Sequence, residues 1–189
     1  SGFKTYEESL RAGAEIYHNL KRILQERGKT TIVGDEGGFA PSLKNNRQAL
    51  EWILTAIEEA GYKPGKHCYI AIDVAATELE VRKEPGNVDC YYDLTSVDTI
   101  LNSEKLIEVY DDWVGKYPLI SIEDGMSETD WNGWQSMTSK LGNKVEFHLF
   151  KSVTKLLEAY EQRKPDLVGF SNYTWNVALS RFAGEWIKD

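Results

Sequence analysis

The 189-residue chain is poor in cysteine and in long apolar runs, and each shortage excludes a class of protein. Its two cysteines, Cys68 and Cys90, cannot build the disulfide framework of a small secreted domain. No run approaches the roughly 18 apolar residues that a membrane-spanning helix needs. The first residues also lack the charged and then apolar pattern of a secretion signal. We therefore expect a reduced, cytoplasmic protein that has no membrane partner.

Basic side chains are the minority among the charged residues. The chain carries 22 lysines and arginines against 30 aspartates and glutamates, for a formal net charge of −8. A surface of this charge repels phosphate backbones, which argues against nucleic acid as the main partner. Wholesale disorder is excluded as well, because 41% of the residues are hydrophobic and 12% are aromatic. The length fits one ordinary domain or two very small ones.

The sequence does contain an alternation of helical and extended patterns. Apolar side chains recur at steps of three and four, the period of an amphipathic helix, over residues 10–24, 50–57, 106–114 and 131–141. Short apolar runs predict strands at residues 30–33, 67–72 and 119–122. Strands separated by helices favour a parallel sheet with crossover helices, so we predict an α/β fold.

Turn and capping residues predict the ends of these elements. Gly28 and Gly61 would end the first two helices. The expected N-terminal caps of the later helices are Asn45 or Asn46, then Ser103, then Ser127 in a capping box with Asp130. Residues 80–93 predict a polar hairpin or excursion with its turn at residues 85–87.

Three acidic residues stand at or soon after the ends of predicted strands. Glu36 comes after the strand at residues 30–33, Asp73 ends the next, and Glu123 ends the third. Ligand sites in parallel α/β folds lie at the carboxyl ends of strands, and carboxylates that converge there suit a hard cation such as Mg²⁺. A carboxyl group beside them could act as a general acid or base. A single acid after a strand is more often a helix cap or a solvated loop residue, so spacing alone leaves both interpretations open.

The loop at residues 34–41, GDEGGFAP, is more specific. Three glycines within five residues permit close approach of the backbone to a ligand, and a mobile segment that closes over it. A plain turn between two elements would explain the glycines equally well. It would not explain the acids between them.

At this loop the chain resembles the enolase family, in which residues 34–41 look like a signature loop. Further blocks similar to that family stand in its order and at compatible spacings: GAEIYHNLK at 13–21, AIEEAGY at 56–62, IAIDVAA at 70–76 and YPLISIED at 117–124. The resemblance covers about residues 2–145 and implies a partial enolase-like TIM barrel.

The resemblance also implies an activity, the reversible dehydration of 2-phosphoglycerate to phosphoenolpyruvate with Mg²⁺ as cofactor. In that family a lysine removes the proton next to the substrate carboxylate, and a glutamate protonates the departing hydroxide. Matched motif by motif, Glu36 takes the acid role. Asp73 and Glu123 take two of the three Mg²⁺-binding carboxylate positions. The intact family form is expected to be a cytoplasmic homodimer.

The chain departs from the family after Val145. The next strand of the family ends in paired aspartates that supply the third metal ligand, whereas residues 146–150 here are EFHLF. The strand with the base lysine does not follow, and the amino-terminal capping domain of the family is not among these residues. We therefore expect the chain by itself to be inactive or nearly so.

The last quarter of the chain has a different resemblance. Residues 164–176, KPDLVGFSNYTWN, are similar to the cobalamin-binding-type domain that precedes many radical S-adenosylmethionine enzymes. We accordingly predict a domain at residues 1–145 and a βαβα segment at residues 146–189. The rival hypothesis is a non-catalytic α/β fragment or fusion that acts as an association or corrinoid-binding module.

Overall fold

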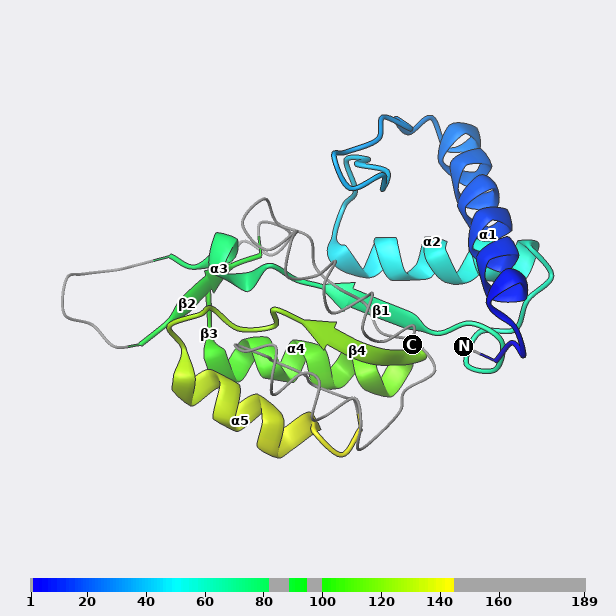
Figure 1. Ribbon diagram of the computed structural model, residues 1–189. Coiled ribbons are helices and arrows are strands. Elements are labelled where there is room, and N and C mark those ends of the chain that lie inside the picture. The colour runs from blue at the N-terminus through cyan, green and yellow to red at the C-terminus, as the bar shows by residue number, and fades with distance from the viewer. Residues whose placement is uncertain (1, 82–88, 95–99, 145–189) are drawn as a thin grey trace, which may run out of the picture. The chain divides into compact units, whose positions relative to one another are not determined.

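The computed structural model describes residues 2–81, 89–94 and 100–144 (Figure 1). The predicted turn at residues 85–87 and the predicted segment at residues 146–189 lie outside the described residues. Helices and strands alternate along the described chain in the order α1 (Tyr6–Glu26), α2 (Asn46–Glu59), β1 (Ile70–Asp73), α3 (Ala76–Leu79), β2 (Tyr91–Asp93), β3 (Ile100–Asn102), α4 (Ser103–Lys116), β4 (Leu119–Glu123) and α5 (Trp131–Leu141).

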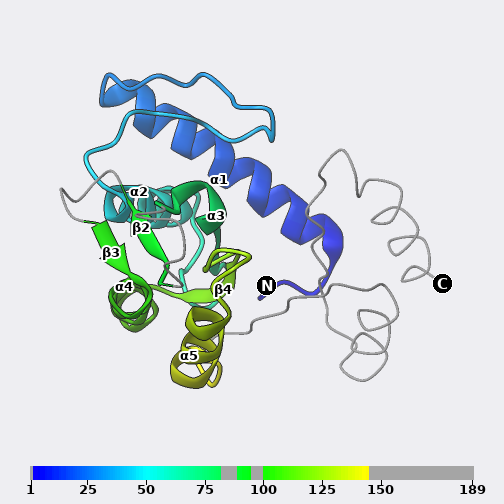
Figure 2. The same cartoon turned by 90° about the vertical axis from the view of Figure 1, so that its left-hand side faces the viewer.

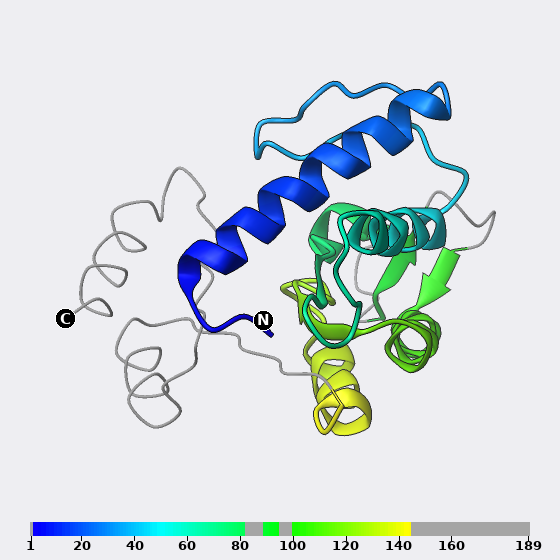
Figure 3. The ribbon, with the colours of Figure 1, turned by 90° about the vertical axis from the view of Figure 1, so that its right-hand side faces the viewer.

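The four predicted helices are confirmed as α1, α2, α4 and α5. Helix α1 ends at Glu26, and Gly28 turns the chain away with a φ of +66°. Asn45 caps α2, since its side chain accepts a hydrogen bond from the N–H of Gln48. Helix α1 packs against α2 (Figure 3), where the Arg27 guanidinium lies over the Trp52 ring, 5.3 Å from its centroid. Of the described helices, none combines the length and apolar character that a membrane crossing requires.

Two predicted caps are displaced. The N-terminal cap of α4 is Asn102, whose side chain accepts from the N–H of Lys105, and Ser103 is the first helical residue. Asp130 caps α5 by itself. The Ser103 hydroxyl donates a hydrogen bond to the Asp130 carboxylate, and the Ser127 hydroxyl donates one to the Glu80 carboxylate. Tertiary hydrogen bonds therefore replace the local capping role of both serines.

The central pairing joins β1 and β4 in parallel, as expected for a crossover fold. Ile72 lies opposite Ile122 and Asp73 opposite Glu123 at the carboxyl ends of the strands. A shorter antiparallel pair joins β2 and β3. Within the described residues the strands do not close into a barrel. The molecule is thus an α/β protein with a parallel strand pair, consistent with part of a barrel.

The predicted strand at residues 30–33 is wrong. Residues 32–40 instead form a tight hairpin, called here the Glu36 hairpin, in which Val33 makes an isolated antiparallel bridge with Phe39. The hairpin bonds to itself, because the N–H of Gly34 donates to the Gly38 carbonyl and that of Ala40 to the Ile32 carbonyl. Backbone groups used in this way are not available for pairing with β1. Ile32 consequently stays 72% exposed despite its β-branched side chain.

The polar hairpin predicted at residues 80–93 is confirmed in its described arms. Glu80 and Tyr92 form an antiparallel bridge, and the N–H of Val81 donates to the carbonyl of Tyr91. The strand β3, which pairs with β2, was not predicted from the sequence.

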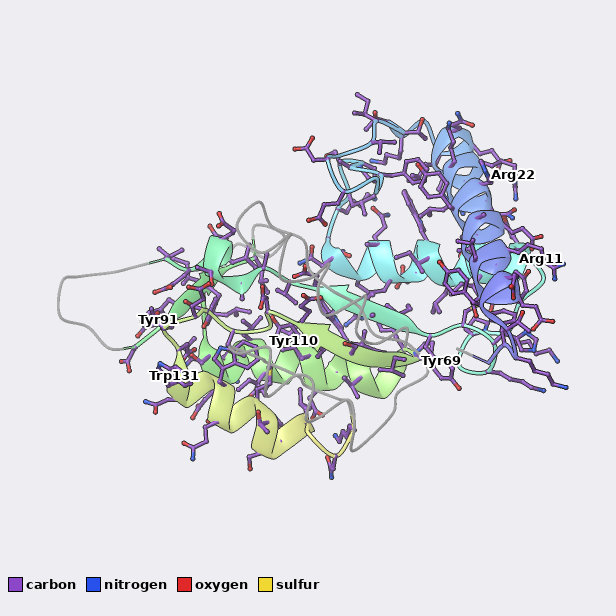
Figure 4. All side chains as sticks on the ribbon, viewed as in Figure 1. Arg11, Arg22, Tyr69, Tyr91, Tyr110 and Trp131 are labelled. Atoms are coloured by element: carbon purple, nitrogen blue, oxygen red, sulfur yellow. The ribbon has the colours of Figure 1, made fainter. Side chains whose placement is uncertain are left out.

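The core lies around β4, with α4 and α5 side by side next to it in two views (Figures 1 and 2). Tyr110 of α4 is fully buried at this place (Figure 4). Its hydroxyl donates to the carbonyl of Gly125, 2.9 Å away, in the loop that follows β4. The other members of the core are mostly aliphatic side chains and methionines, among them Leu50, Ile70, Leu106, Ile107, Leu119, Ile122, Met126, Met137 and Leu141.

A buried polar cluster fastens this loop to β2. The Tyr92 hydroxyl donates to the Asp130 carboxylate at 2.7 Å and accepts from the N–H of Ser127 at 3.1 Å. Asp130 also accepts from the Ser103 hydroxyl and the N–H of Gly133. Burial and the Asp130 carboxylate raise the pKa of the Tyr92 phenol, so it remains a donor. Every member of the cluster is hydrogen-bonded, which makes it rigid.

Removal of the Tyr92 hydroxyl tests how much this cluster contributes to the stability of the fold. We expect Tyr92→Phe to lower the free energy of unfolding by about 1–3 kcal/mol, because it leaves a buried carboxylate and a buried N–H short of a partner. Urea unfolding followed by tryptophan fluorescence measures the change. Tyr69→Phe, at a tyrosine that is 40% exposed, is the matched control and should change it by less than about 0.5 kcal/mol. Equal effects of the two variants would contradict the role of the cluster.

Candidate functional site

Parallel pairing places two of the three predicted acids next to each other. Asp73 and Glu123 are direct partners at the carboxyl ends of β1 and β4, although 50 positions separate them in the sequence. Ile72 and Ile122, one residue earlier, pack into or against the core. Because successive side chains of a strand point to opposite faces, Asp73 and Glu123 project away from that core. Both are exposed.

The third predicted acid acts on the same place. The pKa of the Glu123 carboxyl is raised, first by partial burial and then by the negative charges of Asp73, Asp124 and Glu36. Glu36 lies at the exposed tip of its hairpin, yet its charge reaches Glu123. The charge of Glu36 thus contributes to the raised pKa of Glu123, but within the described residues Glu36 does not join Asp73 and Glu123 in a group of three that could hold a metal ion.

Asp124 is a fourth carboxylate to which the sequence interpretation assigned no role. Partial burial raises its pKa, and the charges of Asp73 and Glu128 raise it further. Its position directly after Glu123 in the 117–124 block was the available signal. That signal was ambiguous, because an acid one position further along a strand normally faces the other way. Here the backbone of Asp124 leaves the strand with a φ of +45°.

The Glu36 hairpin is held to α1 at its base. Phe39 stacks on Tyr17 of α1 with ring centroids 4.4 Å apart. The chain segments before and after the hairpin are joined as well, because Lys29 Nζ donates to the carbonyl of Ser42 at 2.7 Å. Towards the tip, the N–H of Gly37 donates to the carbonyl of Gly34, and Gly37 has a φ of +84° that suits glycine. The glycines thus do form a turn, and this turn is what presents Glu36.

The ligand atoms that Asp73 and Glu123 offer are of the type that a hard divalent cation binds. Asp73 and Glu123 offer only carboxylate oxygens, the ligands that Mg²⁺ prefers, and their mutual repulsion is what a bound cation would relieve. The number of metal-binding side chains is, however, too small for a complete site. Among the described residues, no three His, Cys, Asp or Glu side chains lie close enough together to hold a metal ion. Two ligands are present here, and further ones would have to come from water, substrate or other residues.

Comparison with known proteins gives a consistent result. The family model described as the C-terminal TIM barrel domain of enolase matches residues 1–161. A protein named enolase from Helicobacter hepaticus is 51% identical over 160 residues, which is 83% of this chain and 36% of that protein. One named enolase from Nitratiruptor sp. is 49% identical over 146 residues, or 77% of this chain and 33% of that protein. The chain spans about a third of the length of these relatives.

The raised pKa of Glu123 predicts how stability depends on pH. In the folded state the charged form of Glu123 is disfavoured, so folding loses stability as pH rises from the ordinary glutamate pKa of about 4.3 through the raised value. Glu123→Gln removes this charge. We expect it to raise the free energy of unfolding at pH 7 by up to about 1 kcal/mol, a value reduced by solvent screening.

Urea unfolding of both proteins between pH 4 and pH 8 measures this effect. The advantage of Glu123→Gln should shrink towards zero at pH 4, where the wild-type carboxyl is largely protonated. Glu58→Gln, at an exposed glutamate of α2, is the control and should give a small difference that does not grow with pH in this way. A destabilised Glu123→Gln at pH 7 would show that the carboxylate is favourably bound in the fold.

Proposed function

The chain belongs to the enolase family, whose C-terminal barrel domain it matches over most of its length, and we propose on this basis that it carries part of an enolase active site. The proposed reaction is the Mg²⁺-dependent, reversible dehydration of 2-phosphoglycerate to phosphoenolpyruvate. The observation that carries the proposal is the pairing of Asp73 with Glu123 on neighbouring parallel strands, within reach of the charge of Glu36. For the intact protein we further propose a cytoplasmic location and a homodimer.

Asp73 and Glu123 are the proposed metal ligands. Their carboxylates already repel each other across the strand pair, so a cation held between them would lower the electrostatic energy of the site. When bound, Mg²⁺ supplies stabilisation of the negative charge that develops on the substrate carboxylate. Asp124 adds negative charge beside this pair and thereby favours binding of a cation over an anion.

Glu36 is the proposed general acid. In this role its carboxyl group holds the proton that the departing hydroxide takes up. Its place at the tip of a glycine-rich hairpin suits the task, because small residues on either side let the carboxyl approach a ligand. The stacking of Phe39 on Tyr17 attaches the hairpin that carries Glu36 to helix α1.

The chain alone is proposed to be nearly inactive. Residues 146–189 do not contain the motifs that would supply the base and the third metal carboxylate, although the family model matches the chain as far as residue 161. We expect phosphoenolpyruvate formation by the purified chain with excess Mg²⁺ to be at least about 100-fold slower than by the relative from Helicobacter hepaticus, the lower bound for loss of a general base. Turnover at a comparable rate would contradict this expectation. Any measured activity should disappear in Glu36→Gln and in Asp73→Asn.

Metal binding can be tested without turnover. A ligand that binds only the folded state raises the melting temperature, and Mg²⁺ at about ten times its dissociation constant should raise that of this chain by about 3–6 °C. We expect the rise in the wild-type protein and in Glu58→Gln, and its loss in the double variant Asp73→Asn/Glu123→Gln. Differential scanning fluorimetry over a Mg²⁺ series at constant ionic strength measures it. An unchanged rise in the double variant would reject these two ligands.

A further inference from the structure

Two residues beside the paired carboxylates have an unusual backbone conformation. Among the non-glycine residues that the structure describes, Ala75 and Asp124 are the two with positive φ, at 49° and 45°. Ala75 comes two positions after Asp73, and Asp124 comes directly after Glu123. The departures from ordinary geometry are thus confined to the two strand ends that carry the proposed metal ligands.

This conformation is unfavourable for both residues, although not equally. In the left-handed region the Cβ atom crowds a backbone carbonyl, and only glycine escapes the crowding. Aspartate is several-fold enriched there among non-glycine residues, whereas alanine has no side-chain group that compensates. Such residues persist only where the surrounding structure imposes the conformation. Ala75 is therefore the more informative of the two.

The surroundings that impose it are hydrogen bonds between the two strand ends. The N–H of Val74 donates to the Glu123 carbonyl at 3.0 Å, and that of Ala76 to the Asp124 carbonyl at 2.9 Å. Ala76 itself is completely buried, which fixes the chain beyond the turn. The parallel pairing thus continues past the ends of β1 and β4 and passes through both left-handed residues.

The turn at Ala75 also forms a hydrogen bond with the side chain of Asp73, one of the two proposed metal ligands. The N–H of Ala75 donates to Asp73 Oδ1 at 3.2 Å, which uses one acceptor position of that oxygen and limits rotation of the carboxylate. On the neighbouring strand, the residue after Asp124 is held by Tyr110, whose hydroxyl binds the Gly125 carbonyl. Both carboxylates are therefore attached to backbone segments whose direction is set by a left-handed residue.

We propose that Ala75 and Asp124 are positioning residues, whose left-handed backbone holds Asp73 and Glu123 in the arrangement that binds the cation. The inference rests on the proposed function, because it takes these two carboxylates to be metal ligands. The strain at each strand end therefore has two effects. It lowers the stability of the fold, and it limits the orientations that the two carboxylates can adopt before a cation binds. Glycine relieves the strain but widens the range of backbone conformations, whereas asparagine tolerates the left-handed region without widening it as far.

Ala75→Gly tests this with two readouts of opposite sign. In the metal-free protein we expect a melting temperature about 2–4 °C higher, because the crowding is relieved. In a Mg²⁺ series we expect an apparent dissociation constant about tenfold higher, the lower end of what loss of an outer-shell partner does to metal affinity. Ala75→Asn should keep the gain in melting temperature and restore Mg²⁺ affinity to within about twofold of wild type.

Three control variants separate the effect of backbone geometry from the effect of charge and from the general effect of introducing a glycine. Asp124→Asn removes the charge and keeps a residue that tolerates the left-handed region, and Asp124→Gly removes both. Both should raise the melting temperature, because each removes a charge that lies beside like charges, and the second should raise it further and bind Mg²⁺ still more weakly than the first. Ala14→Gly, at an exposed position within α1, should lower the melting temperature and leave Mg²⁺ affinity unchanged.

The outcomes distinguish this inference from the function on which it rests. If the wild-type chain shows no Mg²⁺-dependent shift, the proposed ligands fail and the inference fails with them. If the wild type binds Mg²⁺ and Ala75→Gly binds it equally well, the ligands stand and the positioning role is overturned. A lower melting temperature for metal-free Ala75→Gly would likewise overturn it, because strain at Ala75 would then not oppose folding.

Discussion

The parallel pairing of β1 with β4 is the constraint on which the rest of this structure depends. It joins segments 50 positions apart and sets Asp73 directly opposite Glu123. The same register places Ile72 and Ile122 together towards the core. One pairing thus creates both the apolar face that stabilises the fold and the charged edge that forms the candidate site. A shift of one residue would exchange the two faces, so register is strongly determined here.

The charged edge works against the stability of the fold, and the loop after β4 shows what offsets it. Glu123 and Asp124 have raised pKa values because burial and like charges disfavour their ionised forms. Directly beyond them, Ser127 and Asp130 are buried and fully hydrogen-bonded, with Tyr92 as the central partner. Charges with perturbed pKa values often gather at functional sites, and a rigid, fully hydrogen-bonded neighbour is what lets the fold tolerate them here.

Local patterns predicted the helices well because the interactions that form a helix are themselves local. Gly28 ends α1 and Asn45 caps α2, as their positions in the sequence indicated. Prediction failed where a local group found a distant partner. Ser127 matched a capping box, yet its hydroxyl is donated to Glu80, 47 positions away. The extended segment at residues 30–33 had the composition of a strand, but it folded back onto residues 38–40.

The sequence by itself determined the types of residue in the site, their order, and the family to which they belong, because these are properties of short motifs around Glu36, Asp73 and Glu123. Only the tertiary structure decided that Asp73 and Glu123 are partners, that Asp124 joins them, and that Ala75 turns left-handed beside them. The physical reason is that charge repulsion and strand register depend on distances in space, which packing sets and spacing along the chain does not.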